Sequence, residues 1–290
     1  MSKIAILTDS SCDIPQEMAE KYGIDIMSFH ILLDDVDYVE RESCTNTEFY
    51  DKMRLAKGVP STAAITPIQF CEKYCQYVDE GYTDVIHVPI NKSGSSTYNN
   101  ALMAQGMLRE ERPEHHMKIH LLDPHTYSMV FGWYLCEMAR KLKNGAEISH
   151  VIQEFEKQMN CMEIILGPYS LKQMKKSGRI SAAAAVMGEL MGVRPIITLI
   201  DGKTKVESKV RGDDKVIPAM IDLCKKRTEG VEDFDYMIGH TSIPQAAELE
   251  KACRKAFGKA PLTTFNLGGV VSANTGPDTL ALVYVGKPRD

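Results

Sequence analysis

Short apolar runs alternate along the first half of the chain with longer stretches that have helical spacing. The apolar runs predict buried strands, and the longer stretches predict helices, two of which begin with capping boxes at Thr45–Glu48 and Thr66–Gln69. Pro67 follows the second cap, at a position where proline favours a helix start. We expect strands over residues 3–7, 24–33, 84–90 and 120–123, and helices over residues 15–22, 46–57, 67–80, 101–111, 126–143 and 147–159.

This alternation of strand and helix is typical of a mainly parallel sheet that is covered by helices on both faces. Polar turns follow three of the predicted strands, and such turns gather at one edge of a parallel sheet. The loop that contains Thr62 can reach the same edge. The three turns are Thr8–Asp13, Asn91–Thr97 and Asp123–Thr126.

The pattern changes near residue 161. The segment from Arg179 to Val193 is apolar nearly all round, so a helix there, with Ala182–Val186 inside it, must be buried. Asp201-Gly202 predicts the turn of a β-hairpin. We expect strands over residues 195–200, 204–210, 235–239, 261–267 and 279–286, and helices over residues 170–177, 213–228 and 244–257.

The predicted fold class is therefore α/β with two domains. The N-terminal domain, residues 1–163, has a mainly parallel sheet flanked by helices and carries the polar loops. The C-terminal α/β domain, residues 164–290, has a mixed sheet and the buried apolar helix.

Composition excludes several classes of function. The net charge of −5 gives no electrostatic support for nucleic-acid binding. No apolar run reaches the roughly 18 residues that a membrane span needs. The apolar segment at the start is too short for a signal peptide, so we expect a cytosolic protein.

Candidate metal and nucleotide sites are weak in this sequence. Eight cysteines are expected to be free thiols in a reducing compartment. Cys71 and Cys75 share a helix face, but no second pair has zinc spacing, so no metal is predicted. Gly202-Lys203-Thr204 resembles the end of a P-loop, yet the required earlier glycine falls at Ile197, so neither a nucleotide nor another cofactor is expected.

The stretch Asn91–Ala101 reads as a strand end, a Gly/Ser-rich turn and a helix start. Its hydroxyls and free backbone N–H groups suit a small anionic head group, although serine at a helix start is also a common cap. Asp9, Asp13 and Asp123 form a second candidate at the same edge, where they either hold a metal or cap local structure. A metal-dependent hydrolase or a phosphotransferase is therefore the alternative function.

Seven motifs, in one order along the whole chain, resemble those of the DegV family of bacterial lipid-binding proteins. They are Thr8–Pro15, Pro60–Pro67, Ser95–Ala101, Leu171–Ser181, Arg194–Ile197, Lys209–Gly212 and Asn274–Pro277. The resemblance implies a two-domain protein that binds one long-chain fatty acid and has no catalytic turnover of its own. It also implies a partnership, because the family includes the subunit of fatty acid kinase that presents the acyl carboxylate to a separate ATP-binding partner.

By position in these motifs, Thr62 and Ser95 would hold the carboxylate, with Gly94 and Ser96 beside them. Asn274 would occupy the place of a supporting histidine. Arg179 and Arg211 would lie at the edge of the head group or on the partner surface. The chain departs from the family pattern at three of its polar positions, where Ala63 and Ala64 replace Ser-Gln and Asn274 replaces His.

A fatty acid also fits the composition. Burial of the tail stabilises a complex by about 0.8 kcal/mol per methylene, so the head group needs only enough hydrogen bonds to offset its desolvation. Most of the 16 methionines are expected to fill the core, but such adaptable side chains also suit an acyl tunnel.

Overall fold

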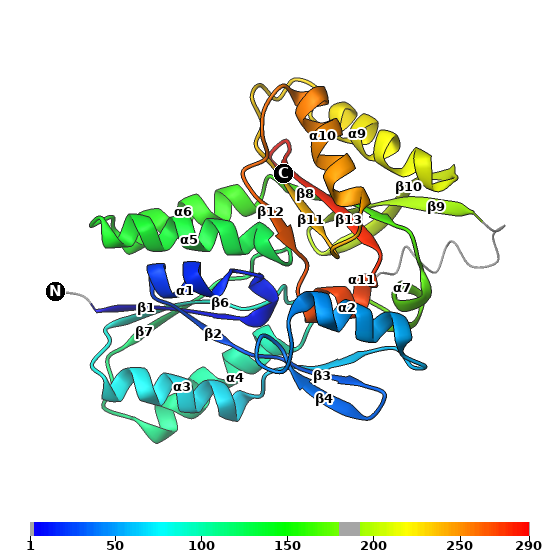
Figure 1. Ribbon diagram of the computed structural model, residues 1–290. Helices are drawn as coiled ribbons and strands as arrows, with labels where there is room; N and C mark the ends of the chain where they lie inside the picture. Colours follow the sequence, from blue (N-terminus) through cyan, green and yellow to red (C-terminus); the bar gives the residue numbers. More distant parts are fainter. Residues whose placement is uncertain (1–2, 180–191, 290) are drawn as a thin grey trace.

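The computed structural model of the chain describes residues 3–179 and 192–289 (Figure 1). The predicted apolar helix around Ala182–Val186 lies outside the described residues. No helix in the described ranges is both long and apolar enough to cross a membrane.

A parallel sheet forms the centre of the N-terminal half. Its strands run in the order β2-β1-β6-β7, and they are β1 (Ile4–Asp9), β2 (Ile24–Met27), β6 (Asp84–Val88) and β7 (Lys118–Leu121). One face carries α1 (Gln16–Tyr22), α5 (Met129–Lys143) and α6 (Ile148–Met159), and the other carries α3 (Pro67–Asp79) and α4 (Thr97–Glu111) (Figure 1). The predicted parallel sheet with helices on both faces is confirmed. The strand order reverses between β1 and β6, and ligands commonly bind at the carboxyl edge near such a reversal.

A small antiparallel sheet follows, in the order β4-β3-β5, with β3 (His30–Leu33), β4 (Val36–Val39) and β5 (Ser61–Ala63). The prediction of one strand over residues 24–33 was therefore wrong. The chain leaves the parallel sheet after Met27 because the Phe29 N–H donates a hydrogen bond to Ser10 Oγ at 3.0 Å and the Phe29 side chain is buried. The predicted connecting loop near Thr62 contains β5, and α2 (Asn46–Leu55) lies between β4 and β5 in the chain.

The C-terminal half is built on a mixed sheet of six strands, in the order β10-β9-β8-β13-β11-β12. The strands are β8 (Met162–Pro168), β9 (Val193–Ile200), β10 (Lys203–Arg211), β11 (Tyr236–His240), β12 (Thr264–Asn266) and β13 (Thr279–Val285). The predicted hairpin is confirmed, because Asp201 and Gly202 have φ angles of 50° and 69°, as a tight turn between β9 and β10 requires. The predicted boundary between residues 163 and 164 falls inside β8 and stays a prediction.

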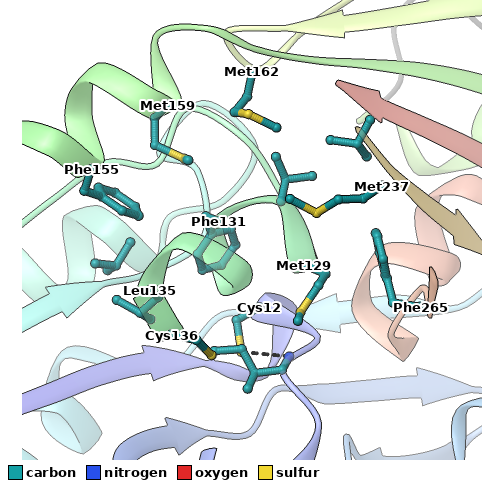
Figure 2. Packing of buried hydrophobic residues seen from close by; sticks show 14 of the residues in the cluster. Cys12, Met129, Phe131, Leu135, Cys136, Phe155, Met159, Met162, Met237 and Phe265 are labelled. Carbon is teal, nitrogen blue, oxygen red and sulfur yellow. Dashed lines mark hydrogen bonds between the residues drawn. The ribbon is translucent and has the colours of Figure 1, made fainter. Parts of the chain in front are cut away.

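Helices α9 (Val216–Arg227) and α10 (Gln245–Phe257) cover the outer face of this sheet, and α7 (Lys172–Ser177) follows β8 (Figure 1). Within the described ranges, single 3₁₀ turns form at η1 (Ser10–Cys12) and η2 (Asp213–Lys215). The inner face packs against α5 and α6 in a shared apolar core, in which Phe131 and Met159 from the helices meet Met162 and Met237 from the sheet (Figure 2). The two halves therefore share one core, which lies between their sheets.

One helix has no counterpart in the sequence prediction. α11 (Gly269–Thr275) begins with glycine and β-branched residues, which are poor helix formers. Its N-terminus is instead stabilised by Glu40, whose Oε1 accepts a hydrogen bond from the Val270 N–H at 2.8 Å. Because Glu40 is 230 residues away in the chain, local sequence gives no signal for this helix.

Candidate functional site

A cavity of about 170 Å³ lies between the two halves. Its polar lining comes mainly from the loops near β5 and β6 and from α11, and its apolar lining comes largely from the inner face of the six-stranded sheet. Six of the seven predicted site residues line this one cavity: Thr62, Gly94, Ser95, Ser96, Arg179 and Asn274. The apolar lining includes Ile164, Leu166, Leu199, Phe265, Val270, Ala281 and Val283.

The loop after β6 is held in place by Asn91. The buried Asn91 Oδ1 accepts hydrogen bonds from Ser93 N at 2.9 Å and from Ser93 Oγ at 3.0 Å. The tip of the β9–β10 hairpin rests on the same two side chains. A Cβ atom on Gly202 would lie 2.2 Å from Asn91 Nδ2 and 2.3 Å from Ser93 Oγ, so only glycine fits there.

Ser95 directly precedes Ser96, the N-cap residue of α4, and lines the cavity. Its Oγ accepts a hydrogen bond from Thr97 N at 3.2 Å and lies 2.8 Å from Thr97 Oγ1. When the Thr97 hydroxyl donates to Ser95, the Ser95 hydroxyl hydrogen remains for a ligand. Ser95 can therefore both accept a hydrogen bond at the start of α4 and donate one to a ligand.

Thr62 reaches the cavity from β5, where it pairs with Ile31 of β3. Its hydroxyl has no hydrogen-bond partner within residues 3–179 and 192–289, so it is available to a ligand. Ala64 lines the cavity nearby, whereas Ala63 is exposed. The replacement of Ser-Gln by two alanines thus removes one polar group from the cavity wall itself.

The end of α11 supplies two more polar groups. Asn274 Nδ2 donates a hydrogen bond to Val270 O at 2.8 Å, which leaves Asn274 Oδ1 as its second polar atom. The neighbouring Thr275 also lines the cavity, and its buried Oγ1 has no partner in the described part of the chain. Sequence reasoning missed Thr275, although it lies inside the Asn274–Pro277 motif.

Two side chains enclose Gly94. A Cβ atom on Gly94 would lie 2.2 Å from the Tyr127 hydroxyl oxygen, so the close approach of this ring requires glycine. On the other side, Arg179 Nε donates a hydrogen bond to Gly94 O at 3.1 Å. Burial raises the pKa of Tyr127, so its hydroxyl stays protonated and can donate near the loop. Tyr127 is a second lining residue that the prediction did not include.

Arg211 does not reach the cavity. It is exposed at the end of β10, where it pairs with Val193 of β9. Arg179 is thus the one charged residue among the described lining residues.

The three aspartates of the alternative prediction serve separate local structures. The oxygens of Asp9 accept hydrogen bonds from Ser11 and from the Ile90 N–H at 2.7 Å, and burial raises the pKa of Asp9 to about 7. Asp13 accepts a hydrogen bond from Ser128 Oγ, and burial together with the nearby Glu40 raises the pKa of Asp13.

Asp123, the third aspartate, accepts a hydrogen bond from His125 N at 3.0 Å and lies 3.4 Å from Lys92 Nζ. Within the ranges that the structure describes, no group of three or more His, Cys, Asp or Glu side chains is arranged to hold a metal ion. The geometry therefore lends no support to a metal site built on these aspartates.

Comparison with known proteins gives one consistent result. Residues 3–287 match a family model described as uncharacterised protein, DegV family. A DegV domain-containing protein of Clostridium perfringens is 28% identical over 289 residues, which cover 98% of this chain and 99% of that protein.

Solved structures share the fold over nearly the full length. A protein from Eubacterium ventriosum that is described as binding stearic acid has a TM-score of 0.89 at 23% identity and covers 99% of both chains. A protein from Thermotoga maritima, described as revealing a fatty acid binding function, has a TM-score of 0.81 at 25% identity and covers 99% of this chain and all of its own.

Proposed function

The chain belongs to the DegV family, and from this premise we propose that it binds one long-chain fatty acid in the cavity between its two halves. The carboxylate is held by the hydroxyls of Thr62 and Ser95, and the tail lies over the apolar face of the six-stranded sheet. The observation that carries the proposal is that both hydroxyls and this apolar face line the same cavity.

The energetics favour a ligand of this kind. The described lining is mostly apolar, and each buried methylene contributes about 0.8 kcal/mol, so the tail accounts for most of the affinity. A desolvated carboxylate needs hydrogen-bond donors, and Thr62, Ser95 and Thr275 each have a hydroxyl on the cavity wall. Arg179 donates to the backbone of Gly94, so it supports the head-group loop at the mouth.

The proposal is tested first by what the purified protein carries. Denaturing extraction and mass spectrometry should find a fatty acid in a ratio near one per chain. The double variant Thr62→Val/Ser95→Ala should bind fatty acid at least about a hundredfold more weakly, because hydrogen bonds to charged groups contribute about 1.5–3 kcal/mol each. The variant Ser149→Ala, at an exposed helical position, is the control. Unchanged affinity in the Thr62/Ser95 variant would contradict the assignment of the carboxylate site.

We further propose that the chain presents its fatty acid to a separate ATP-dependent kinase and needs no cofactor of its own. Arg211, which is exposed and away from the cavity, is then a candidate for the partner surface, and Arg179 lies where the partner would meet the head group. In the presence of ATP and hydroxylamine, the isolated chain should form no acyl hydroxamate, and addition of a fatty acid kinase ATP-binding subunit should produce it. Acyl phosphate formation by the isolated chain would overturn this part of the proposal. The cytosolic location stays a prediction.

A further inference from the structure

Two small residues lie in one row across the inner face of the sheet, and one of them, Ala281, lines the cavity. The strand register aligns Ile197 of β9, Leu166 of β8, Ala281 of β13, Gly239 of β11 and Phe265 of β12. The side chains in this row shrink from leucine to alanine to glycine and then return to a large ring. The row therefore forms a trough at Ala281 and Gly239, and over Gly239 this trough is filled by the Phe265 ring and by Leu267.

Phe265 closes the deep end of this trough. A Cβ atom on Gly239 would lie 3.0 Å from the ring atom Cζ and 3.1 Å from Cε2, so the ring folds back over its neighbouring strand. The Phe265 side chain is buried and lines the cavity. The parallel row of Leu199, Ile164, Val283 and Met237 has no small member, so the trough is confined to the row that ends at Phe265.

A second pocket lies behind the ring. It has a volume of about 720 Å³ and also counts Phe265 among its lining residues. Its wall is more polar than that of the first cavity, because Asp13, Glu40, Thr264 and Asn266 lie beside its apolar residues. Methylene groups that entered it would gain less than in the first cavity, since the hydrophobic contribution requires an apolar environment. Figure 2 shows Phe265, Met129 and Met237 around this part of the core.

We propose that Phe265, seated on Gly239, is the residue that stops the acyl tail and sets the longest chain that the site accepts. This inference rests on the proposed function and adds to it the residue pair that determines chain length. Affinity rises about fourfold for each added methylene until the tail meets the ring, and then it levels off or falls.

Two substitutions change the trough in opposite directions. Phe265→Ala removes the ring and leaves an apolar space in its place, so the preferred chain length increases by roughly two to four carbons, which fill the volume that the ring vacated. Gly239→Ala adds a methyl group under the ring, which has to move away from the strand because the contact is already tight. The preferred chain then becomes shorter.

The experiment measures dissociation constants for saturated fatty acids of increasing length, by displacement of a fluorescent fatty acid from the delipidated full chain. Phe257→Ala is the matched control, because Phe257 packs on the outer face of the same sheet, away from the cavity. Thermal melting of each variant verifies that it is folded. If Phe265→Ala fails to fold, Gly239→Ala decides the question alone.

An optimum that moves to longer chains in Phe265→Ala, or to shorter chains in Gly239→Ala, supports the inference. The same optimum in folded variants and wild type overturns it while leaving the proposed function intact. Absence of binding by wild type at every length overturns the proposed function, so the two failures are distinguishable.

Discussion

Thr275 shows how much a single hydroxyl reveals about the cavity. Its Oγ1 is buried, faces the cavity and has no partner in the described part of the chain. A buried hydroxyl without a hydrogen bond costs stability, so its retention on a ligand-sized cavity suggests that the ligand supplies the bond.

Replacement of this hydroxyl by a methyl group separates its effect on ligand affinity from its effect on the stability of the fold. Thr275→Val is expected to weaken fatty acid binding by roughly 5- to 50-fold while the free energy of unfolding of the lipid-free protein stays equal or rises slightly. The comparison is Thr279→Val, because the Thr279 hydroxyl donates to Thr275 O at 2.9 Å and its loss should cost about 1 kcal/mol of stability. Chemical denaturation and ligand titration on the same samples measure both quantities. Loss of stability without loss of affinity in Thr275→Val would show a purely structural role.

Single residues also show what sequence can and cannot predict. Thr62, Ser95 and Asn274 lie 33 to 212 positions apart, yet their motifs indicated one site and the structure gathers them around one cavity. Arg211 was grouped with them by motif alone and lies elsewhere, because β10 carries it away from the cavity. Thr275 was missed, because nothing in the sequence indicates which threonines lack an internal partner.

The sequence predicted well those helices and turns that are determined by residues close to them in the chain. The capping boxes at Thr45 and Thr66 form as expected, and so does the tight turn at Asp201-Gly202. The failures near Met27 and at α11 depend on distant contacts. The chain leaves the parallel sheet after Met27 because of Ser10, and α11 exists because Glu40 reaches its N-terminus.

α11 therefore offers a test of an element that is stabilised from a distance. Glu40→Ala leaves the Val270 N–H and the Ser10 hydroxyl without their acceptor, so the free energy of unfolding should fall by about 2–4 kcal/mol. Fatty acid affinity should fall with it, because α11 carries Asn274 and Thr275. Glu40→Gln keeps an acceptor and should lose less than half as much. If Glu40→Ala leaves amide exchange in residues 269–275 unchanged, the proposed dependence of α11 on Glu40 is wrong.

The free energy of unfolding of the whole molecule depends on pH through two buried groups, His87 and Asp9, which change it in opposite directions. Burial lowers the pKa of His87 to about 3, so between pH 6.5 and 3 the unfolded chain binds a proton that the folded chain does not. This ring therefore lowers the free energy of unfolding as the pH falls. Asp9, with a pKa raised to about 7, acts in the opposite sense, because its contribution is present below pH 4 and is lost as the pH rises through 7.

A substitution at His87 isolates one of these effects. As the pH falls from 6.5 to 5, the free energy of unfolding of wild type should drop by about 2 kcal/mol more than that of His87→Gln. This difference is expected whether or not the two proteins are equally stable at pH 7. Glutamine can still accept the hydrogen bond that Tyr74 shares with His87 Nδ1 at 2.6 Å. His150→Gln, on an exposed position, is the control. Parallel pH dependences for His87→Gln and wild type would be evidence that His87 is protonated in the folded protein.

The close packing of Gly202 against Asn91 and Ser93 has a consequence for recombination between related genes. A gene that joined the N-terminal half of this chain to the C-terminal half of another DegV protein would need a glycine at the hairpin tip, because any Cβ atom there collides with Asn91. It would also need a glycine at position 268, where a Cβ atom would collide with Asp13. A backbone N–H at position 270 would be needed as well, to donate a hydrogen bond to Glu40. The two halves thus fit as a matched pair, and chimeras should regain stability only when both sides of these contacts come from the same parent.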